Sequence, residues 1–327
     1  MSKSIVSRMV DSAISNQQWI AAHVSLTLTI AGTVFNLLTF TILCQSTFRN
    51  AKTRPTLHYM RTIAIFDIFM LYGWNLDHFF STVYGFEIQT STMPLCRFLS
   101  FLNYFAAQTS AWLRVFICWD RYLSLSRLHK TWFSHSNNVL TVIACIIVCC
   151  AIINGQFFIF GCSFNADGSI NSYSTAFQTY PTWDYLNLAL YNCAPFILMV
   201  IFNSGVIYYL IHLRRTSTVQ NSRIQHRSIS ITLVITTFLF LIMTIPSTVG
   251  FAFFSNTAGD TILYFLDGLL YSYHTLSFPL YIITFDEFRR EVFGIITCNR
   301  NKRRVVPQTQ TGVALHTIDA TKVMAIA

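Results

Sequence analysis

The amino-acid sequence predicts an all-α membrane protein: a bundle of seven transmembrane helices followed by a short amphipathic helix at the membrane interface. Composition is the first indication. Of 327 residues, 53% are hydrophobic and only 11% are charged, whereas soluble domains carry about 25% charged residues. The second indication is a series of long apolar runs separated by short polar segments, which is typical of polytopic helical membrane proteins.

The third indication is the distribution of basic residues. All but four of the 22 lysines and arginines lie in alternate connectors between the apolar runs. The exceptions are Lys3, Arg8 and Arg97 in the other connectors and Arg114 inside a run. This asymmetry follows the positive-inside rule and predicts an extracellular N-terminus. The formal net charge of +9 is then expected to face cytosol and anionic headgroups rather than nucleic acid.

Seven apolar segments are long enough to cross a bilayer as helices. They are 19–44, 57–82, 94–125, 138–160, 184–213, 226–254 and 261–284, with 1–18 as an extracellular N-terminus and 297–327 as a cytoplasmic tail. The first run is long enough to span by itself, so no cleavable signal is expected. Residues 285–296 carry apolar side chains at helical spacing, which predicts an amphipathic helix lying in the membrane interface.

The third segment carries the most specific pattern. It opens on Cys96 and closes on Asp120-Arg121-Tyr122. Cys96 and Asp120 are 24 residues apart, about 36 Å in an α-helix, which crosses a hydrocarbon core of about 30 Å with some tilt. A cysteine at one face and an Asp-Arg pair at the other resembles the third helix of rhodopsin-like (family A) G-protein-coupled receptors.

The resemblance covers residues 19 to 296. Further matches occur in order at Asn36, Asp67, Ser110, Pro195, Phe240, Pro246 and Tyr281. It implies a divergent receptor, of peptide-receptor-like or orphan invertebrate type, multi-pass in the plasma membrane, with no enzymatic activity and no cofactor. Its partners would be an extracellular ligand, the lipid bilayer and a cytosolic heterotrimeric G protein. The resemblance also implies a Cys96–Cys162 disulfide that pins the following segment over the ligand pocket.

Roles in activation follow from the resemblance. The residues expected to act in G-protein coupling and activation are Asp120, Arg121, Tyr122, Arg214, Arg215, Phe240, Pro246 and Tyr281. Three departures leave a weakly coupling or non-coupling receptor open. Thr244 stands in place of the usual tryptophan, Asn203 stands where a tyrosine is common, and Ser277-Phe278-Pro279-Leu280-Tyr281 is a degraded Asn-Pro-x-x-Tyr whose alignment around Pro279 is arguable.

Polar residues inside the spans form the next set of candidates, because such groups are costly in lipid and require partners. They are Asn36, Asp67, Ser110, Arg114, His274 and Ser277. In the family, the aspartate and serine that Asp67 and Ser110 match help to bind sodium. Our hypothesis is that Arg114 forms a buried ion pair with Asp67 and replaces that ion. The alternative is that Arg114 snorkels into a water-filled cavity.

The expected ligand pocket contains Asp77, Asn103, Asp267 and Tyr271. Asn103 stands where amine receptors carry an aspartate, which argues against an amine. The segment 261–284 has no lysine, which argues against retinal. Acidic residues gather near the outer face, at Asp77, Glu87, Asp184, Asp260 and Asp267. They favour a basic peptide, although Asp77 is equally well explained as a solvated side chain.

Around Asp167-Gly168 the alternation predicts a β-hairpin with a two-residue turn. Cys298 is a candidate for palmitoylation, with a plain cytosolic thiol as the alternative. The alternative function is a chemosensory receptor for small environmental molecules. A seven-helix transporter or channel is the least favoured, since neither paired broken helices nor inverted halves are evident.

Overall fold

The computed structural model describes residues 2–45, 48, 56–126, 135–172, 182–216, 221–254, 257 and 259–297, and their side chains except at 2–15, 213–216, 221–230 and 260. The side chains of Arg214 and Arg215 therefore lie outside the described part, as do Cys298 and the predicted tail beyond Thr297. Contacts divide the chain into two units, Met1–Val292 and Phe293–Ala327. The description that follows concerns the first.

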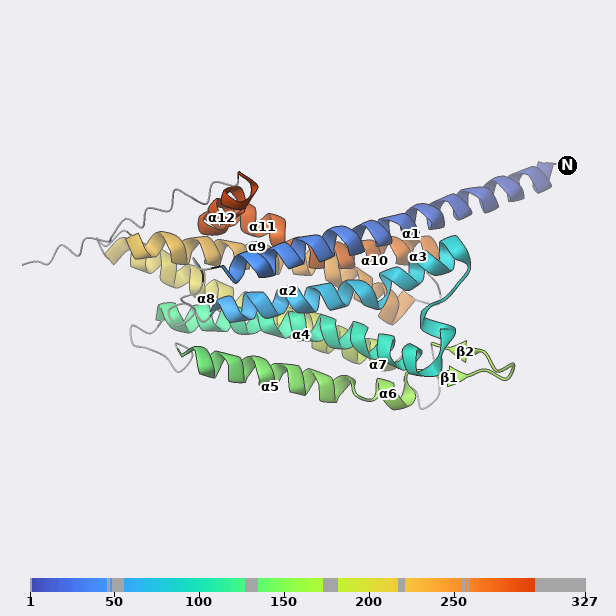
Figure 1. Cartoon of the computed structure of the whole chain (residues 1–327), viewed down its shortest axis with the longest axis horizontal. Helices are drawn as coiled ribbons and strands as arrows, with labels where there is room; N and C mark the ends of the chain where they lie inside the picture. The colour runs from blue at the N-terminus through green and yellow to red at the C-terminus, as the bar shows by residue number, and fades with distance from the viewer. Residues whose placement is uncertain are drawn as a thin grey trace, which may run out of the picture. The chain divides into compact units, whose positions relative to one another are not determined.

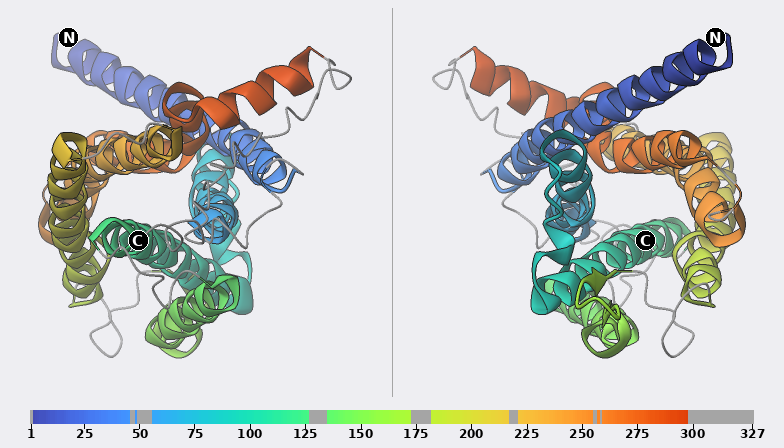
Figure 2. Two further views of the ribbon diagram at one scale, coloured as in Figure 1. Left: turned by 90° about the vertical axis from the view of Figure 1, so that its left-hand side faces the viewer. Right: turned by 90° about the vertical axis from the view of Figure 1, so that its right-hand side faces the viewer.

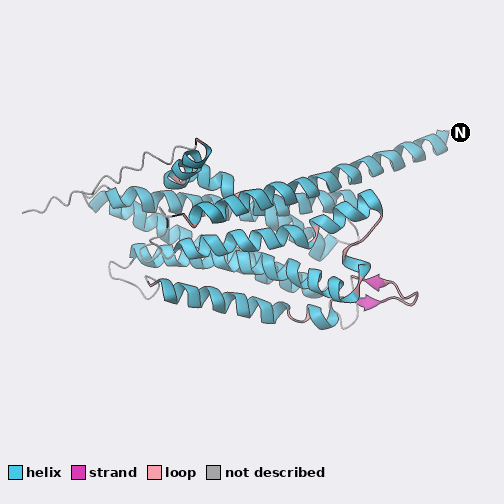
Figure 3. Ribbon diagram, in the orientation of Figure 1, coloured by secondary structure: helices cyan, strands magenta, loops and turns pink. Residues whose placement is uncertain are grey.

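The chain is all-α apart from one small hairpin, which is the only strand pair in the described residues (Figure 3). The helices are α1 (Ser2–Leu43), α2 (Thr56–Gly73), α3 (Asn75–Tyr84), α4 (Met93–Ser126), α5 (Ser136–Asn154), α6 (Phe157–Phe160), α7 (Thr182–Asn187), α8 (Ala194–Thr216), α9 (Asn221–Phe254), α10 (Asp260–Thr275), α11 (Ser277–Thr284) and α12 (Asp286–Ile296). A 3₁₀ turn, η2 (Gln89–Ser91), and a π-helix, η5 (Leu188–Cys193), complete the helical elements.

Helix α4 packs against several other elements. It contacts α2, α5, α6 and α8, and also η2 and η5. The end-on views show α4 running alongside these neighbours (Figure 2). Helix α1 approaches α2 and α10 closely at Gly32, where a Cβ would lie 2.2 Å from Cγ2 of Thr275 and 2.4 Å from Cδ1 of Leu71. A side chain at that crossing would require the side chains of Thr275 and Leu71 to shift.

Four helical segments in the described residues are long and apolar enough to cross a membrane: Asn16–Leu43, Ser136–Phe160, Thr182–His212 and Ile231–Phe254. They match the first, fourth, fifth and sixth predicted spans. The other three predicted spans correspond to α2 with α3, to α4, and to α10 with α11 (Figure 1). Those three contain the buried charged and imidazole groups Asp67, Arg114 and His274, which lower their mean hydropathy.

Three predicted spans are interrupted rather than continuous. The fourth has a turn at residues 155 and 156, between α5 and α6. The second breaks at Trp74, where the side-chain amide of Asn75 donates to the carbonyl oxygen of Leu71 at 3.2 Å. That carbonyl is the one to which the backbone N–H of Asn75 would donate in an unbroken helix. The seventh breaks at Leu276, because Pro279 lies in the first turn of α11 and has no N–H for the carbonyl of Thr275.

The hairpin forms, but its predicted turn is wrong. Strands β1 (Ser163–Phe164) and β2 (Ile170–Asn171) pair antiparallel, with Phe164 opposite Ile170. Asn165 N–H donates to the carbonyl of Ser169 at 2.8 Å, so Ala166, Asp167 and Gly168 form a three-residue loop. Gly168 has φ 83°, which suits the left-handed last position of such a loop. Hydrogen bonds from Ser169 hold the pKa of Asp167 below its usual value.

Candidate functional site

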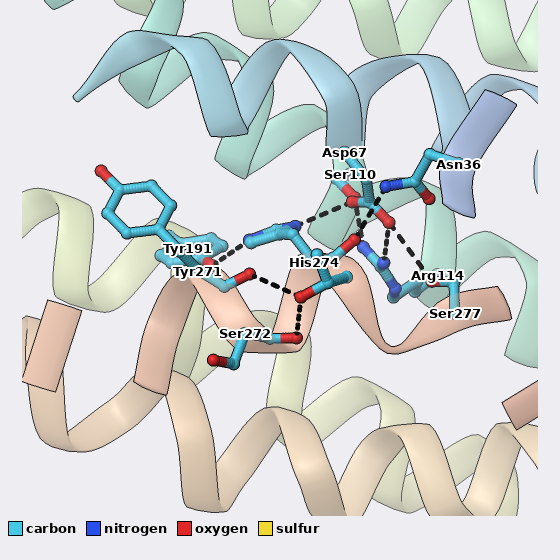
Figure 4. A network of polar contacts seen from close by, with 10 residues as sticks. Asn36, Asp67, Ser110, Arg114, Tyr191, Tyr271, Ser272, His274 and Ser277 are labelled. Atoms are coloured by element: carbon cyan, nitrogen blue, oxygen red, sulfur yellow. Dashed lines mark hydrogen bonds and ion pairs between the residues drawn. The ribbon is translucent and has the colours of Figure 1, made fainter. Parts of the chain in front are cut away.

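The centre of the bundle contains a buried cluster around Asp67. Arg114 donates from Nη2 to Oδ2 of Asp67 at 2.7 Å, and Ser110 donates to Oδ1 at 2.6 Å. His274 Nδ1 lies 2.8 Å from Oδ1, and Ser277 donates to Oδ2 at 3.3 Å. Arg114 also donates to the hydroxyl of Ser110. Figure 4 shows these side chains converging from α2, α4, α10 and α11.

Burial makes this pairing necessary. Asp67 is 0% exposed and Arg114 5% exposed, and an isolated charge in such surroundings costs several kcal/mol. The guanidinium also lies over the ring of Tyr273, with Cζ 4.9 Å from the ring centroid, a favourable cation–π geometry. The predicted Asp67–Arg114 ion pair is therefore present.

His274 extends the cluster toward η5. Its Nε2 lies 3.2 Å from the hydroxyl of Tyr191, and its backbone carbonyl accepts from the amide of Asn36 at 3.0 Å. A neutral imidazole that donates from Nδ1 to the carboxylate accepts from Tyr191 at Nε2. The formal charges of Asp67 and Arg114 then cancel, which lets the cluster remain buried.

The carboxylate does not fit a sodium ion, because both of its oxygens already accept from N–H or O–H donors. We therefore expect sodium to have little effect on this protein. The unfolding temperature of the purified chain should be equal in sodium chloride and in choline chloride, and agonist affinity should be equally insensitive.

Arg114→Leu is the control for this test, because it removes the tethered cation. Sodium is expected to raise the unfolding temperature of that variant, because an ion that binds only the folded state stabilises the folded state. A clear sodium dependence of the unmodified chain would contradict the replacement of the ion by Arg114.

The expected cytosolic end of α4 holds a second polar group. Thr56 donates to Oδ2 of Asp120 at 2.7 Å and accepts from Nη2 of Arg121 at 2.8 Å. One hydroxyl thus bridges the acid and the base of the tripeptide. The ring of Tyr122 packs on Gly205 of α8, where a Cβ would lie 2.6 Å from Cδ2 and Cε2 of the ring.

Of the expected activation residues in the later helices, Phe240 and Tyr281 lie beside the cluster. Phe240 packs edge-on against Tyr191 and Tyr273, with ring centroids 5.6 Å and 5.5 Å away. Pro246 lies within α9, which continues through it. Tyr281 packs against Phe288 of α12 and, with Arg114, lines a cavity of about 20 Å³.

At the other end of α4, Cys96 is joined to Cys162 with a Cα–Cα distance of 6.3 Å, as the resemblance implied. The disulfide ties the start of the hairpin to α4. Beside it, a cavity of about 50 Å³ is lined by Asn103, Gln89 and Ser172, among others. Ordinary ligand pockets hold roughly 300–1,000 Å³, so this cavity has room for water alone.

The four expected pocket residues have hydrogen-bond partners within the described part of the chain. Tyr271 donates to Oδ1 of Asn103 at 3.3 Å, which joins α10 to α4. Asp267 accepts from Ser247 of α9 at 3.0 Å. Asp77 accepts the backbone N–H of Gln89 at 2.7 Å and is 9% exposed, so the expectation of a solvated side chain is wrong.

Sequence reasoning missed an amide chain on the other side of α4. Gln108 donates to Asn187 at 3.1 Å, and Asn154 donates to Gln108 at 2.8 Å. Gln108 and Asn154 are 1% and 0% exposed. The signal was available, since an amide within an apolar run demands a partner as Asn36 does. Thr56 and Tyr191 carried no such signal.

Comparison with known proteins adds no family assignment. No protein-family model matches the sequence, and no curated protein does either. The resemblance to rhodopsin-like receptors therefore depends on the residues and spacings described above.

Proposed function

We propose that this chain is a divergent rhodopsin-like receptor of the plasma membrane that converts binding of an extracellular ligand into activation of a cytosolic heterotrimeric G protein. The proposal takes α1, α2 with α3, α4, α5 with α6, α7 to α8, α9, and α10 with α11 as seven membrane spans. The N-terminus is then extracellular and α12 lies in the inner interface.

The observation that carries this proposal is the organisation of α4. One helix has at one end a cysteine bonded to a hairpin and at the other a buried Asp120-Arg121 pair held by a threonine. Between them lies a charge-neutral polar cluster that links α4 to α2, α10 and α11. Such an arrangement connects the two ends of α4 to neighbouring elements through buried contacts.

The proposed mechanism is a shift between two conformations. An agonist stabilises the conformation in which the first half of α9 swings outward about Pro246, because only differential affinity for two states shifts their equilibrium. The movement opens the cytosolic end, and Arg121 leaves Thr56 to contact the G protein.

Replacement of Arg121 tests the proposal. The full-length chain in lipid nanodiscs is expected to raise GTP turnover by a panel of heterotrimeric G proteins above that of each G protein alone. Arg121→Ala should reduce turnover to the level of the G protein alone. Arg97→Ala is the matched control, because it removes the same side chain from the opposite end of α4 and should leave turnover unchanged.

Equal background turnover for the unmodified chain and Arg121→Ala, across the panel, would contradict G-protein coupling. It would favour the non-coupling receptor that the unusual residues at Thr244 and Asn203 had left open.

For the ligand, we favour a basic peptide. Asp267 and Asp184 each accept a single hydroxyl bond, from Ser247 at 3.0 Å and from Tyr104 at 3.4 Å. A cationic group of the ligand would compensate the charge of either carboxylate. Asp77 is a weaker candidate, because it already accepts a backbone N–H. A screen of basic peptides with a G-protein sensor identifies the ligand, and small environmental molecules are the alternative set.

A further inference from the structure

The π-helix η5 turns two consecutive side chains toward the interior of the bundle. Tyr191 is 1% exposed and Asn192 is 0% exposed. In an α-helix consecutive side chains point about 100° apart. A π-helix has more residues in each turn, so the angle is smaller and both side chains face inward. Single π-turns of this kind occur frequently at functional sites.

Asn192 uses both ends of its amide to bind α9. Nδ2 donates to Oγ1 of Thr248 at 2.7 Å, and Oδ1 accepts from Oγ1 of Thr244 at 2.7 Å. Thr244 is 0% exposed and Thr248 8% exposed. Both hydroxyls also lie within hydrogen-bond distance of backbone carbonyls of their own helix, Thr244 of Phe240 at 2.6 Å and Thr248 of Ile245 at 3.1 Å.

Pro246 lies between the two threonines. Helix α9 continues through Pro246, but proline has no N–H to donate to the carbonyl of Ile242, so the helix is weakest there. Thr244 belongs to the half before Pro246 and Thr248 to the half after it. A single amide therefore holds both halves of α9 against η5 across the weakest point of the helix.

We propose that Asn192 is a positioning residue that clamps α9 across Pro246 and stabilises the closed conformation. An outward swing of the first half of α9 breaks the bond to Thr244 and leaves the bond to Thr248 intact. The clamp thus takes the place of the aromatic switch that this chain lacks at Thr244. Its effect on signalling rests on the proposed function, whereas its effect on α9 does not.

The same π-helix reaches the buried ion cluster. Tyr191 contacts His274 at 3.2 Å, and His274 contacts Asp67 at 2.8 Å. A displacement of η5 consequently changes the environment of the cluster and of the clamp together.

Hydrogen–deuterium exchange separates the clamp from the signalling function. The full chain in nanodiscs is compared with Asn192→Leu and Thr244→Val, which remove the Thr244 bond with little change of volume. One buried hydrogen bond is worth about 1 kcal/mol, so the backbone amides of residues 237–250 should exchange roughly fivefold faster in both variants. The double variant should exchange no faster than Asn192→Leu alone, because that variant already removes the Thr244 bond together with the Thr248 bond.

Two variants serve as controls. Thr244→Ser keeps the hydroxyl and should restore slow exchange. Thr236→Val removes a hydroxyl that donates to the carbonyl of Leu233 in its own helix at 3.0 Å, and should leave exchange unchanged.

The outcomes distinguish the two proposals. Unchanged exchange in Asn192→Leu and Thr244→Val overturns the clamp, whatever the turnover. Faster exchange together with higher agonist-independent GTP turnover supports both the clamp and its role in activation. Faster exchange with no turnover by any form of the chain supports the clamp and contradicts G-protein coupling.

Discussion

Arg114→Met should destabilise the folded chain by about 3–5 kcal/mol, because it leaves the carboxylate of Asp67 buried without a cation. Asp67 is 0% exposed, and Arg114 is its only arginine or lysine partner in the described residues. Combining Arg114→Met with Asp67→Asn should recover most of the loss, since the uncharged amide can accept from Ser110 through its oxygen and donate to the hydroxyl of Ser277 through its nitrogen. Equilibrium denaturation in mixed micelles measures both changes in the free energy of unfolding.

The matched control is an exposed pair of the same type. Nη2 of Arg289 lies 2.5 Å from Oδ1 of Asp286, and the two side chains are 44% and 60% exposed. Solvent screening limits such a pair to about 1 kcal/mol or less, so Arg289→Met should have little effect. If Arg114→Met costs no more than Arg289→Met, the ion pair does not hold the bundle together.

Removal of the disulfide should have the next largest effect. The double variant Cys96→Ala with Cys162→Ala opens a crosslink between residues 66 positions apart. Crosslinks of this kind typically contribute about 2–4 kcal/mol to the free energy of unfolding. Because the contribution grows with the length of the closed loop, we expect a value toward the upper end of that range here. The free energy of unfolding should fall by about that amount, and reducing agent should no longer affect stability. Cys149→Ala, at an exposed free cysteine, is the control.

The same two cysteines report topology. After mild reduction of intact cells, an impermeant thiol reagent should label the unmodified chain and should label the double variant much less. Labelling that appears only after the membrane is permeabilised would place Cys96 on the cytosolic side. The topology would then be inverted, and the receptor proposal would fail with it.

Electrostatic reasoning from the sequence was most successful where a charge lay inside an apolar run. Arg114 required a counter-charge. The resemblance to rhodopsin-like receptors places Asp67 as its nearest acid, so the pair could be predicted. The contact between His274 and Asp67 could not be predicted in this way, because 207 positions separate the two residues. Nothing local indicates which face of α10 turns toward α2.

The interruptions of the helices were also beyond sequence reasoning. Trp74-Asn75 reads as part of a continuous apolar helix, and the break depends on a side-chain amide that competes for the carbonyl of Leu71. The π-helix at Leu188–Cys193 has no sequence signature of its own. The hairpin loop was misjudged by one residue, because Gly168 closes a three-residue loop as readily as it supports a two-residue turn.

By itself, the sequence determined that the chain is helical and apolar, and which residues are too costly to leave without partners. These properties follow from composition, spacing and the free energy of burying charge, all of which are local or additive. Only the tertiary structure decided which partners are met: Thr56 between Asp120 and Arg121, His274 on Asp67, and Asn192 across Pro246. Those contacts depend on how helices rotate and break against one another, which is set by packing over the whole bundle.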